Sequence, residues 1–385
     1  MGFEIVGLDG VLKPVATAKG LPNSHYVDSA TFDVEREALF FKNWAAVGFG
    51  KDVPEEADAL PVEFLGLPLL MVRGRDGKVR VFQNTCRHRG MVLITEPKKV
   101  RGVIRCPYHS WCYDLEGRLK TTPHVGGPGH NTHEDIDRDA LGLIEIRSHV
   151  WQDIVFINLS GDADPFEEAT ASLLDRWSEF EQKAWYGGSD SAFELDIACN
   201  WKLAVENYCE SYHLPWVHPG LNAYSRLEDH YHIIESGAFS GQGTRVYNPS
   251  LSDNQAFVDF AGLSQQWDRQ GEYIALFPNV LLGVHRDHRY AIILMPNGPE
   301  QTVERLALYY ASEAMTAPDF SDLRAKNREL WKEVFIEDIG VVEGMQRGRH
   351  GRYFDGGKFS PVMDEPTWVF HHWVASHLKA HASAA

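Results

Sequence analysis

The sequence predicts an α+β protein in which a small all-β domain precedes a larger domain with an antiparallel sheet covered by helices. Three observations support this fold class. Short β-rich runs separated by turns fill residues from about 45 to 160. Helical patterns then appear, and apolar runs of strand length lie between them. At 385 residues the chain is long enough to form two cores of this kind.

The N-terminal part of the chain predicts one helix followed by the all-β domain. Residues 32–44 carry apolar side chains at helical spacing, so residues 1–44 are expected to pack with the larger domain. Within the all-β domain, expected over 45–155, residues 67–84 indicate a hairpin that turns at Arg75-Asp76-Gly77. Residues 149–160 indicate further strands.

The larger domain is expected over residues 156–385. Three segments are predicted to be helical: 165–181, a long helix that begins near Ser321, and 365–381 with Pro366 in its first turn. The apolar runs at 273–285 and 290–296 are predicted to be strands of its sheet.

Composition excludes several classes of function. With 54 acidic and 37 basic side chains the net charge is −17, which argues against nucleic acid as a partner. No run reaches the ~18–20 apolar residues of a membrane span, and the N-terminus lacks the pattern of a secretory signal. Cysteines 86, 106, 112, 199 and 209 form an odd, sparse set, which argues for reduced thiols and a cytoplasmic location.

Two short loops combine one thiol and one imidazole each. Cys86 and His88 form Cys-x-His, and seventeen residues later Cys106 and His109 form Cys-x2-His. Zinc fingers usually pair Cys with Cys and His with His, whereas a [2Fe–2S] cluster can take both thiolates on one iron and both imidazoles on the other. The spacing therefore predicts such a cluster, with a structural zinc site or four unrelated residues as the alternatives.

A second candidate centre lies in NWKLAVENYCESYHLPWVHPG, residues 200–220. Helical spacing would place Glu206, Glu210 and His213 on one face, and Pro215 would turn the chain so that His218 returns beside His213. Two histidines and one carboxylate make a facial triad that holds ferrous iron with positions open for dioxygen. The carboxylate is expected from the long C-terminal helix, which offers Glu337, Asp338 and Glu343.

Residues 86–113 resemble a Rieske domain. Met91 and Tyr108 stand where respiratory Rieske proteins carry an additional disulfide, so the oxygenase branch is the better match. The whole constellation resembles the large (alpha) subunit of Rieske non-haem iron oxygenases, the aromatic-ring-hydroxylating family. This resemblance implies a Rieske domain over 45–155, a catalytic domain over 156–385, and Asp338 as the third iron ligand beside His213 and His218.

The resemblance also implies a role for Glu210. In this family a carboxylate three residues before the first iron histidine links it to a cluster histidine of the neighbouring subunit, here His109. Many ring dioxygenases resemble this stretch but carry Asp, with one more residue after the Asn; Glu at the shorter spacing resembles the branch that oxidises glycine betaine and carnitine. Asn207 lies one turn earlier, near the iron or in a structural hydrogen bond.

The implied function is that of a terminal oxygenase. It would use O2 and electrons from NAD(P)H, delivered by a separate ferredoxin or flavin reductase, to hydroxylate a small organic substrate, with one or two oxygen atoms inserted. An aromatic substrate is expected; the alternatives are an N-methyl or quaternary ammonium compound and, more remotely, electron transfer without oxygenase activity. A homotrimer is implied because one chain's cluster would serve the next chain's iron.

Other charged residues and histidines have several interpretations. A substrate carboxylate would want a buried Arg such as Arg245 or Arg286, and His285 or His288 could line the pocket or bond at the surface. Four C-terminal histidines are expected on a solvated or subunit-packing helix: His371, His372, His377 and His381. A basic stretch near the cluster motif suggests a docking site for the electron donor, a solvated loop or a subunit contact: Arg87, Arg89, Lys98, Lys99, Arg101 and Arg105.

Overall fold

The computed structural model describes residues 7–235, 237–249, 251–252 and 255–384. The chain divides into two compact units. Ala46–Asp162 form the smaller one, and the segments before and after it together form the larger one. The α+β fold class predicted from the sequence is confirmed.

The smaller unit contains only β-sheet among its long elements. A seven-stranded sheet has the order β1-β10-β9-β4-β3-β2-β5, and a small sheet has the order β6-β7-β8. The predicted hairpin is confirmed as the antiparallel pair β3 and β4, with Leu70 opposite Phe82. The strands are β1 (Ala45–Phe49), β2 (Asp58–Phe64), β3 (Leu67–Arg73), β4 (Val79–Gln83), β5 (Lys98–Lys99), β6 (Ile104–Arg105), β7 (Cys112–Tyr113), β8 (Leu119–Thr121), β9 (Glu145–Trp151) and β10 (Ile154–Asn158).

The larger unit is built on an eight-stranded antiparallel sheet. Its order is β11-β18-β17-β16-β15-β14-β13, and β12 also pairs with β18. The predicted strands over 273–285 and 290–296 are present as β15, β16 and β17. The strands are β11 (Trp185–Tyr186), β12 (Ala192–Ile197), β13 (His230–Ile233), β14 (Phe239–Thr244), β15 (Gly271–Leu276), β16 (Val280–Val284), β17 (His288–Pro296) and β18 (Thr302–Tyr310).

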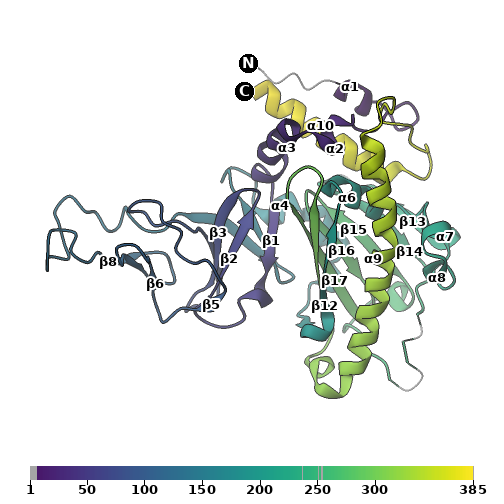
Figure 1. Cartoon of the computed structure of the whole chain (residues 1–385). Coiled ribbons are helices and arrows are strands. Elements are labelled where there is room, and N and C mark those ends of the chain that lie inside the picture. Colours follow the sequence, from purple (N-terminus) through teal and green to yellow (C-terminus); the bar gives the residue numbers. More distant parts are fainter. Residues whose placement is uncertain (1–6, 236, 250, 253–254, 385) are drawn as a thin grey trace. The chain divides into compact units, whose positions relative to one another are not determined.

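Three helices pack on this sheet: α6 (Trp201–Cys209), α9 (Ser321–Arg349) and α10 (Glu365–Ala384). Figure 1 shows α9 running along the sheet. Asn200 caps the N-terminus of α6, where its side chain accepts from the Lys202 N–H, and the helix is buried along almost its whole length. It contacts both α9 and α10, so the central helix brings the site-bearing segments together.

The remaining helices are short. Two predicted helices differ from the structure. The first begins earlier, because Asp28 caps α3, and it continues as a π-helix, η1. The helix predicted over 165–181 is broken, and at the break the Thr170 hydroxyl donates to Phe166 O at 2.6 Å. The short helices are α1 (Leu8–Val11), α2 (Ser24–Val27), α3 (Ser29–Glu35), η1 (Arg36–Phe41), α4 (Phe166–Ala169), α5 (Ala171–Arg176), α7 (Leu214–Val217) and α8 (Pro219–Asn222).

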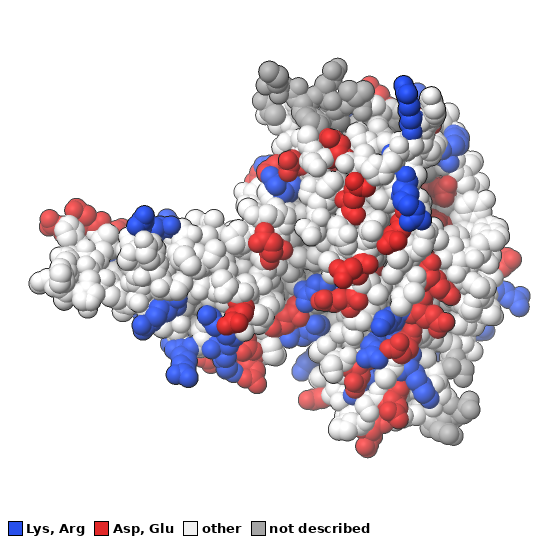
Figure 2. All heavy atoms as spheres, viewed as in Figure 1, with Lys and Arg blue, Asp and Glu red and all other residues white. Residues whose placement is uncertain are grey.

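Charge is arranged differently inside and outside the larger unit. Figure 2 shows acidic and basic side chains interspersed where α9 lies. Inside, Glu206 lies 3.1 Å from His371 Nε2 and 3.5 Å from Arg349, and all three are buried. The expectation that His371 is solvated or packs between subunits is therefore wrong, because it pairs with a carboxylate of the neighbouring helix.

No helix within the described residues is long and apolar enough to cross a membrane.

Candidate metal centres and active site

The two cluster-motif loops of the smaller unit have the same backbone geometry. The Cys86 N–H donates to Met91 O and the Cys106 N–H donates to Trp111 O, each at 2.8 Å. Each cysteine carbonyl in turn accepts from the residue four positions later, Gly90 at 2.9 Å and Ser110 at 3.1 Å. The loops are thus near-copies of each other that present a thiol and an imidazole at equivalent places.

Both thiols face inward and both imidazoles lie nearer the surface. Cys86 and Cys106 are 3% and 1% exposed, whereas His88 is exposed and His109 is half-buried. The imidazole rings have centroids 4.7 Å apart. Burial raises the pKa of the Cys106 thiol, and hydrogen bonds from the backbone amides of Tyr108 and His109 act in the opposite direction. Backbone N–H groups aimed at a sulfur are what a cluster thiolate requires.

Neighbouring aromatic residues fix these side chains. The Tyr113 hydroxyl lies 3.3 Å from Cys86 Sγ and accepts from the Arg87 N–H at 3.0 Å. Trp111 stacks on His88 at 4.8 Å. The spacing of the motif contained no signal for these two supporting residues.

The loop geometry fits a two-iron group better than a single metal ion. His109 Nδ1 is buried and has no hydrogen-bond partner, as expected of a ligand atom without its metal. Four ligands of one zinc ion would have to converge. Among the described residues, however, the one group with three ligand atoms within 4.8 Å of one another is His213, His218 and Asp338.

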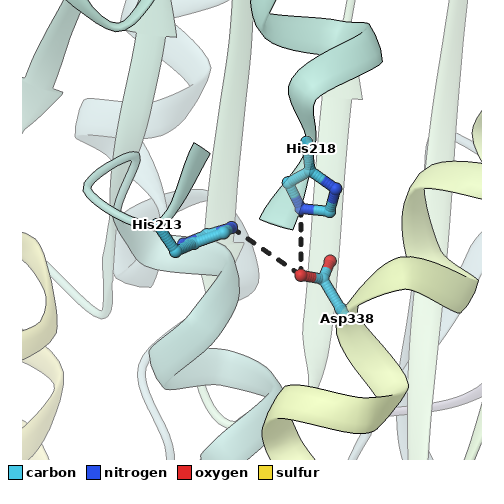
Figure 3. A group of neighbouring side chains, drawn as sticks. All are labelled: His213, His218 and Asp338. Carbon is cyan, nitrogen blue, oxygen red and sulfur yellow. Dashed lines mark ion pairs between the residues drawn. The ribbon is translucent and has the colours of Figure 1, made fainter. Parts of the chain in front are cut away.

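That second group lies in the larger unit (Figure 3). Asp338 Oδ1, on α9, is 2.9 Å from His218 Nε2 and 3.7 Å from His213 Nε2. Although it is buried and faces both nitrogens, this oxygen accepts no hydrogen bond. Two imidazoles and one carboxylate that converge without hydrogen bonding form a facial set suited to ferrous iron.

Each of these imidazoles is held by a carboxylate at its other nitrogen. His213 Nδ1 lies 2.6 Å from Glu210, and His218 Nδ1 lies 2.7 Å from Glu337. The contacts turn both Nε2 atoms towards Asp338, as outer carboxylates do at metal sites. Burial lowers the pKa of His218, but the charges of Asp338 and Glu337 and the hydrogen bond to Glu337 outweigh burial and raise this pKa above its usual value.

The local backbone differs from the sequence prediction. Helix α6 ends at Cys209 and Glu210 is extended, so Glu206, Glu210 and His213 do not share one helical face. His213 and His218 flank the one-turn helix α7, and Pro215 lies within its first turn. This proline does not end a long helix; proline is compatible with a first turn because the N–H it lacks would have had no partner there.

The other predicted residues lie as follows. Glu337 holds His218, and Glu343 accepts from the Ala198 N–H at 3.1 Å, away from the triad. Asn207 lines the pocket beside the triad. Arg286 is paired with Asp259, and Arg245 lies over the Tyr231 ring, so neither lines that pocket.

The pocket beside the triad is small and walled by aromatic rings. Its volume is about 50 Å³. Five aromatic side chains line it: Tyr208, Tyr273, Tyr290, Trp331 and Phe335. Tyr208 donates to Leu282 O at 2.8 Å and lies 3.0 Å from the Tyr290 hydroxyl, so these two rings are held in place.

A buried acid that shares a cavity with Asp338 was not predicted from the sequence. Glu304, on β18, is 7% exposed and lines a small cavity with Asn207, Tyr208 and Asp338. Burial, and to a lesser extent the charge of Asp338, raises the pKa of Glu304 to about 8. A single Glu in a strand gives no sequence signal for this.

Comparison with known proteins identifies both units. Residues 43–133 match the Rieske [2Fe-2S] domain, and residues 184–380 match the catalytic domain of the ring hydroxylating alpha subunit. The chain is 26% identical to the carnitine monooxygenase oxygenase subunit of Acinetobacter pittii, over 93% of this chain and 94% of that protein. It is 24% identical to the glycine betaine monooxygenase oxygenase subunit of Chromohalobacter salexigens, over 94% and 87%.

A solved structure shows the same fold. The crystal structure of a quaternary ammonium Rieske monooxygenase in complex with L-carnitine has a TM-score of 0.76 and 24% identity, covering 97% of this chain and 99% of that one. Both family models and this fold agree with the two centres described above. The chain therefore belongs to the ring-hydroxylating alpha-subunit family, as a Rieske non-haem iron oxygenase whose cofactors are a [2Fe–2S] cluster and a mononuclear iron.

Proposed function

We propose that this protein is the oxygenase component that hydroxylates a small quaternary ammonium compound at a carbon attached to nitrogen. The observation that carries the proposal is the set of five aromatic rings that wall the pocket at the triad. The proposal replaces the aromatic substrate expected from the family resemblance with the alternative of an N-methyl or quaternary ammonium compound.

Each centre is assigned its ligands on chemical grounds. Cys86, Cys106, His88 and His109 would hold the [2Fe–2S] cluster, and His213, His218 and Asp338 would hold the iron. Mixed thiolate and imidazole ligation gives the cluster a high potential, and a facial triad leaves positions open for dioxygen.

The aromatic walls suit a cation without hydrogen-bond donors. A tetraalkylammonium group binds to the faces of Trp and Tyr rings through the quadrupole of the ring. Among the described residues that line this pocket there is no lysine or arginine to repel such a group. The curated relatives reported above act on carnitine and on glycine betaine, which both carry it.

The reaction is a balanced monooxygenation. When bound, the iron and the cluster supply dioxygen activation and electrons. One oxygen atom enters a C–H bond, while two electrons and two protons convert the other to water. Hydroxylation next to a quaternary nitrogen is followed by C–N cleavage, which releases a tertiary amine, an aldehyde and a proton. The electrons would come from NAD(P)H through a separate ferredoxin or flavin reductase.

The protein's own residues position and protect this chemistry. Glu210 and Glu337 orient the two imidazoles, and the buried rings of Tyr290 and Trp331, each 2% exposed, exclude water from the substrate side. Glu210 would also connect His213 to His109 of a neighbouring chain in a homotrimer. Exposed aromatic residues flank both ends of that link, Trp216 at 72% and Tyr108 at 56%, as a subunit contact would require.

The test is anaerobic reconstitution with iron and sulfide, followed by substrate-dependent O2 uptake with a chemical reductant. We expect L-carnitine, glycine betaine or choline to stimulate uptake and to yield aldehyde and amine. Stimulation by benzoate or naphthalene alone would contradict the proposed substrate class, while stimulation by no compound in the presence of both centres would contradict the oxygenase role.

A further inference from the structure

A second, larger cavity lies next to the aromatic pocket. Its volume is about 330 Å³, the size of a ligand site, whereas the aromatic pocket at the triad holds only about 50 Å³. Tyr247, Phe257, Trp267, His285 and His288 are among its lining residues. Two basic and two acidic residues also line it: Arg269, Arg286, Asp268 and Asp287.

Buried polar groups without partners lie between the two cavities. Both ring nitrogens of His285 and the hydroxyls of Tyr247 and Tyr273 are buried and have no hydrogen-bond partner. These side chains are only 1%, 9% and 7% exposed. The His285 ring centroid is 4.2 Å from that of Tyr247 and 5.5 Å from that of Tyr273, so the three groups form one cluster. An unpaired buried polar group is costly, so a cluster of three points to a missing ligand.

The backbone leaves space for this cluster. A Cβ added at Gly271 would lie 2.9 Å from the His285 ring and 3.3 Å from the Tyr273 hydroxyl. The cavity is thus shaped around the two polar side chains by the absence of a side chain on β15.

Two side chains of the iron-side pocket, Trp331 and Tyr273, contact the His285 ring. Trp331 lines the aromatic pocket, lies 5.2 Å from His285 between ring centroids and stacks with Tyr247 at 6.0 Å. Its indole N–H donates to His288 Nε2 at 3.0 Å, and His288 Nδ1 is 2.6 Å from Asp287. Tyr273 lines the aromatic pocket and contacts His285, so the cluster directly adjoins the ammonium site.

We infer that this cavity is the second half of the substrate site and that Tyr247, Tyr273 and His285 bind the carboxylate end of the substrate. This inference rests on the proposed function and narrows it from quaternary ammonium compounds in general to zwitterions that carry an acid. The aromatic rings would hold the ammonium group while the cluster receives the other end.

The donor inventory of the cluster fits a carboxylate. Two tyrosine hydroxyls and one neutral imidazole supply three donors and only a few acceptors, and a carboxylate accepts at two oxygens. Burial lowers the pKa of His285 well below its usual value, so this ring is neutral and donates from one nitrogen. The charged lining residues balance, with Arg269 and Arg286 against Asp268 and Asp287, so the three donors and not a net charge would select the carboxylate.

The test uses isothermal titration calorimetry on protein that is loaded with iron and contains its [2Fe–2S] cluster. It compares the affinities of four probes: L-carnitine, glycine betaine, tetramethylammonium and butyrate. The variants are Tyr247→Phe and His285→Leu. We expect each variant to weaken L-carnitine and glycine betaine by about 10-fold or more while tetramethylammonium is unchanged, because a hydrogen bond to a charged group is lost. Thermal unfolding should be unchanged or improved, since an unpaired buried polar group is removed.

Tyr231→Phe is the matched control. Tyr231 lies on the same sheet and its hydroxyl donates to Glu272 outside both cavities, so this variant should bind all four probes as the wild type does. Unchanged affinity for the two zwitterions in both variants would overturn the inference and leave the proposed substrate class intact. Equal weakening of tetramethylammonium in the variants would also overturn the inference. Failure of the wild type to bind any of the four probes would overturn both the inference and the proposed substrate class.

The opposite combination separates the two proposals. If wild type binds butyrate but neither ammonium probe, and Tyr247→Phe or His285→Leu weakens butyrate, the carboxylate site stands and the quaternary ammonium proposal fails.

Discussion

Glu210 and Glu337 contact the two triad histidines at the same nitrogen, but from different elements. Glu210 follows α6 in the chain and reaches the adjacent His213, while Glu337 reaches His218 from α9, one position before Asp338. Consecutive residues of one helix therefore provide both an orienting carboxylate and the acid that faces the two Nε2 atoms. The two residues differ in their proposed roles, because only Glu210 is proposed to link the iron site to the cluster of a neighbouring chain.

Glu210→Gln tests that role. We expect normal cluster colour and iron content but turnover reduced by about 10–100-fold, because the amide keeps the shape of the side chain and loses its charge. Glu343→Gln on α9 is the control, since Glu343 contacts the Ala198 N–H away from the triad. Iron content and product formation are measured on the same samples, and wild-type turnover in Glu210→Gln would contradict the bridge.

Glu304 makes a pH-dependent contribution to stability. Its folded pKa of about 8 lies above the ordinary value of 4.5, so between these values the folded chain binds more protons than the unfolded chain. The contribution of Glu304 to the free energy of unfolding therefore falls as pH rises through this window.

Glu304→Gln removes this titration. In iron-free protein, the stability of Glu304→Gln relative to wild type should grow by up to about 1.4 kcal/mol per pH unit from about pH 4.5 to 8. Urea unfolding at a series of pH values measures it, with the exposed Glu194→Gln on β12 as the control. A constant difference across this window would show that Glu304 is not a buried neutral acid.

At the scale of elements, the two cluster loops share a backbone conformation, but different residue types adopt it in the two loops. The fourth residue after each cysteine has positive φ, 70° at Gly90 and 59° at Ser110. Glycine adopts this conformation freely, whereas a residue with Cβ is strained there. The second loop therefore holds its ligands at a conformational cost that the first loop avoids.

Reciprocal substitutions measure this cost. Gly90→Ala should lower the stability of the smaller unit by about 1 kcal/mol through the backbone alone, because its Cβ would meet no atom within 4 Å. Ser110→Gly should leave stability equal or higher. Loss of visible cluster absorbance on heating reports both, and a less stable Ser110→Gly would mean that the serine side chain contributes more than its strain costs.

At the scale of the whole molecule, the two cofactor-binding motifs belong to separate compact units, Ala46–Asp162 and the remainder of the chain. A homotrimer in which electrons pass between chains makes a distinctive prediction. Cys106→Ser removes a proposed cluster ligand, and Asp338→Ala removes a proposed iron ligand. Each variant alone should be inactive.

Co-expression of these two variants with different affinity tags tests the direction of transfer. Mixed oligomers should recover part of the wild-type turnover, because an intact cluster in one chain then lies beside an intact iron site in the next. Mixtures of separately purified homo-oligomers are the control and should stay inactive. Inactive mixed oligomers with the expected iron and sulfide contents would show that electrons move within one chain.

The sequence by itself determined the fold class, the family and the residues expected to bind metal, because these depend on local spacing. Cys86, His88, Cys106 and His109 lie in two short loops, and His213 and His218 lie five positions apart, so their patterns can be read along the chain. Helical periodicity likewise located α9 and α10. The same local reasoning extended α6 past Cys209, whereas the helix ends there and Glu210 is extended.

Only the tertiary structure decided which acid of α9 faces the two histidines and what surrounds them. Glu337, Asp338 and Glu343 all carry a carboxylate on the same helix, and their contacts depend on how α9 packs against α6 and the sheet. The pocket walls come from α6, β15, β17 and α9, and the unpartnered His285 meets Tyr247 and Tyr273 from separate segments of the chain. Burial and contacts between distant segments created these features, and neither quantity is encoded in the spacing of neighbouring residues.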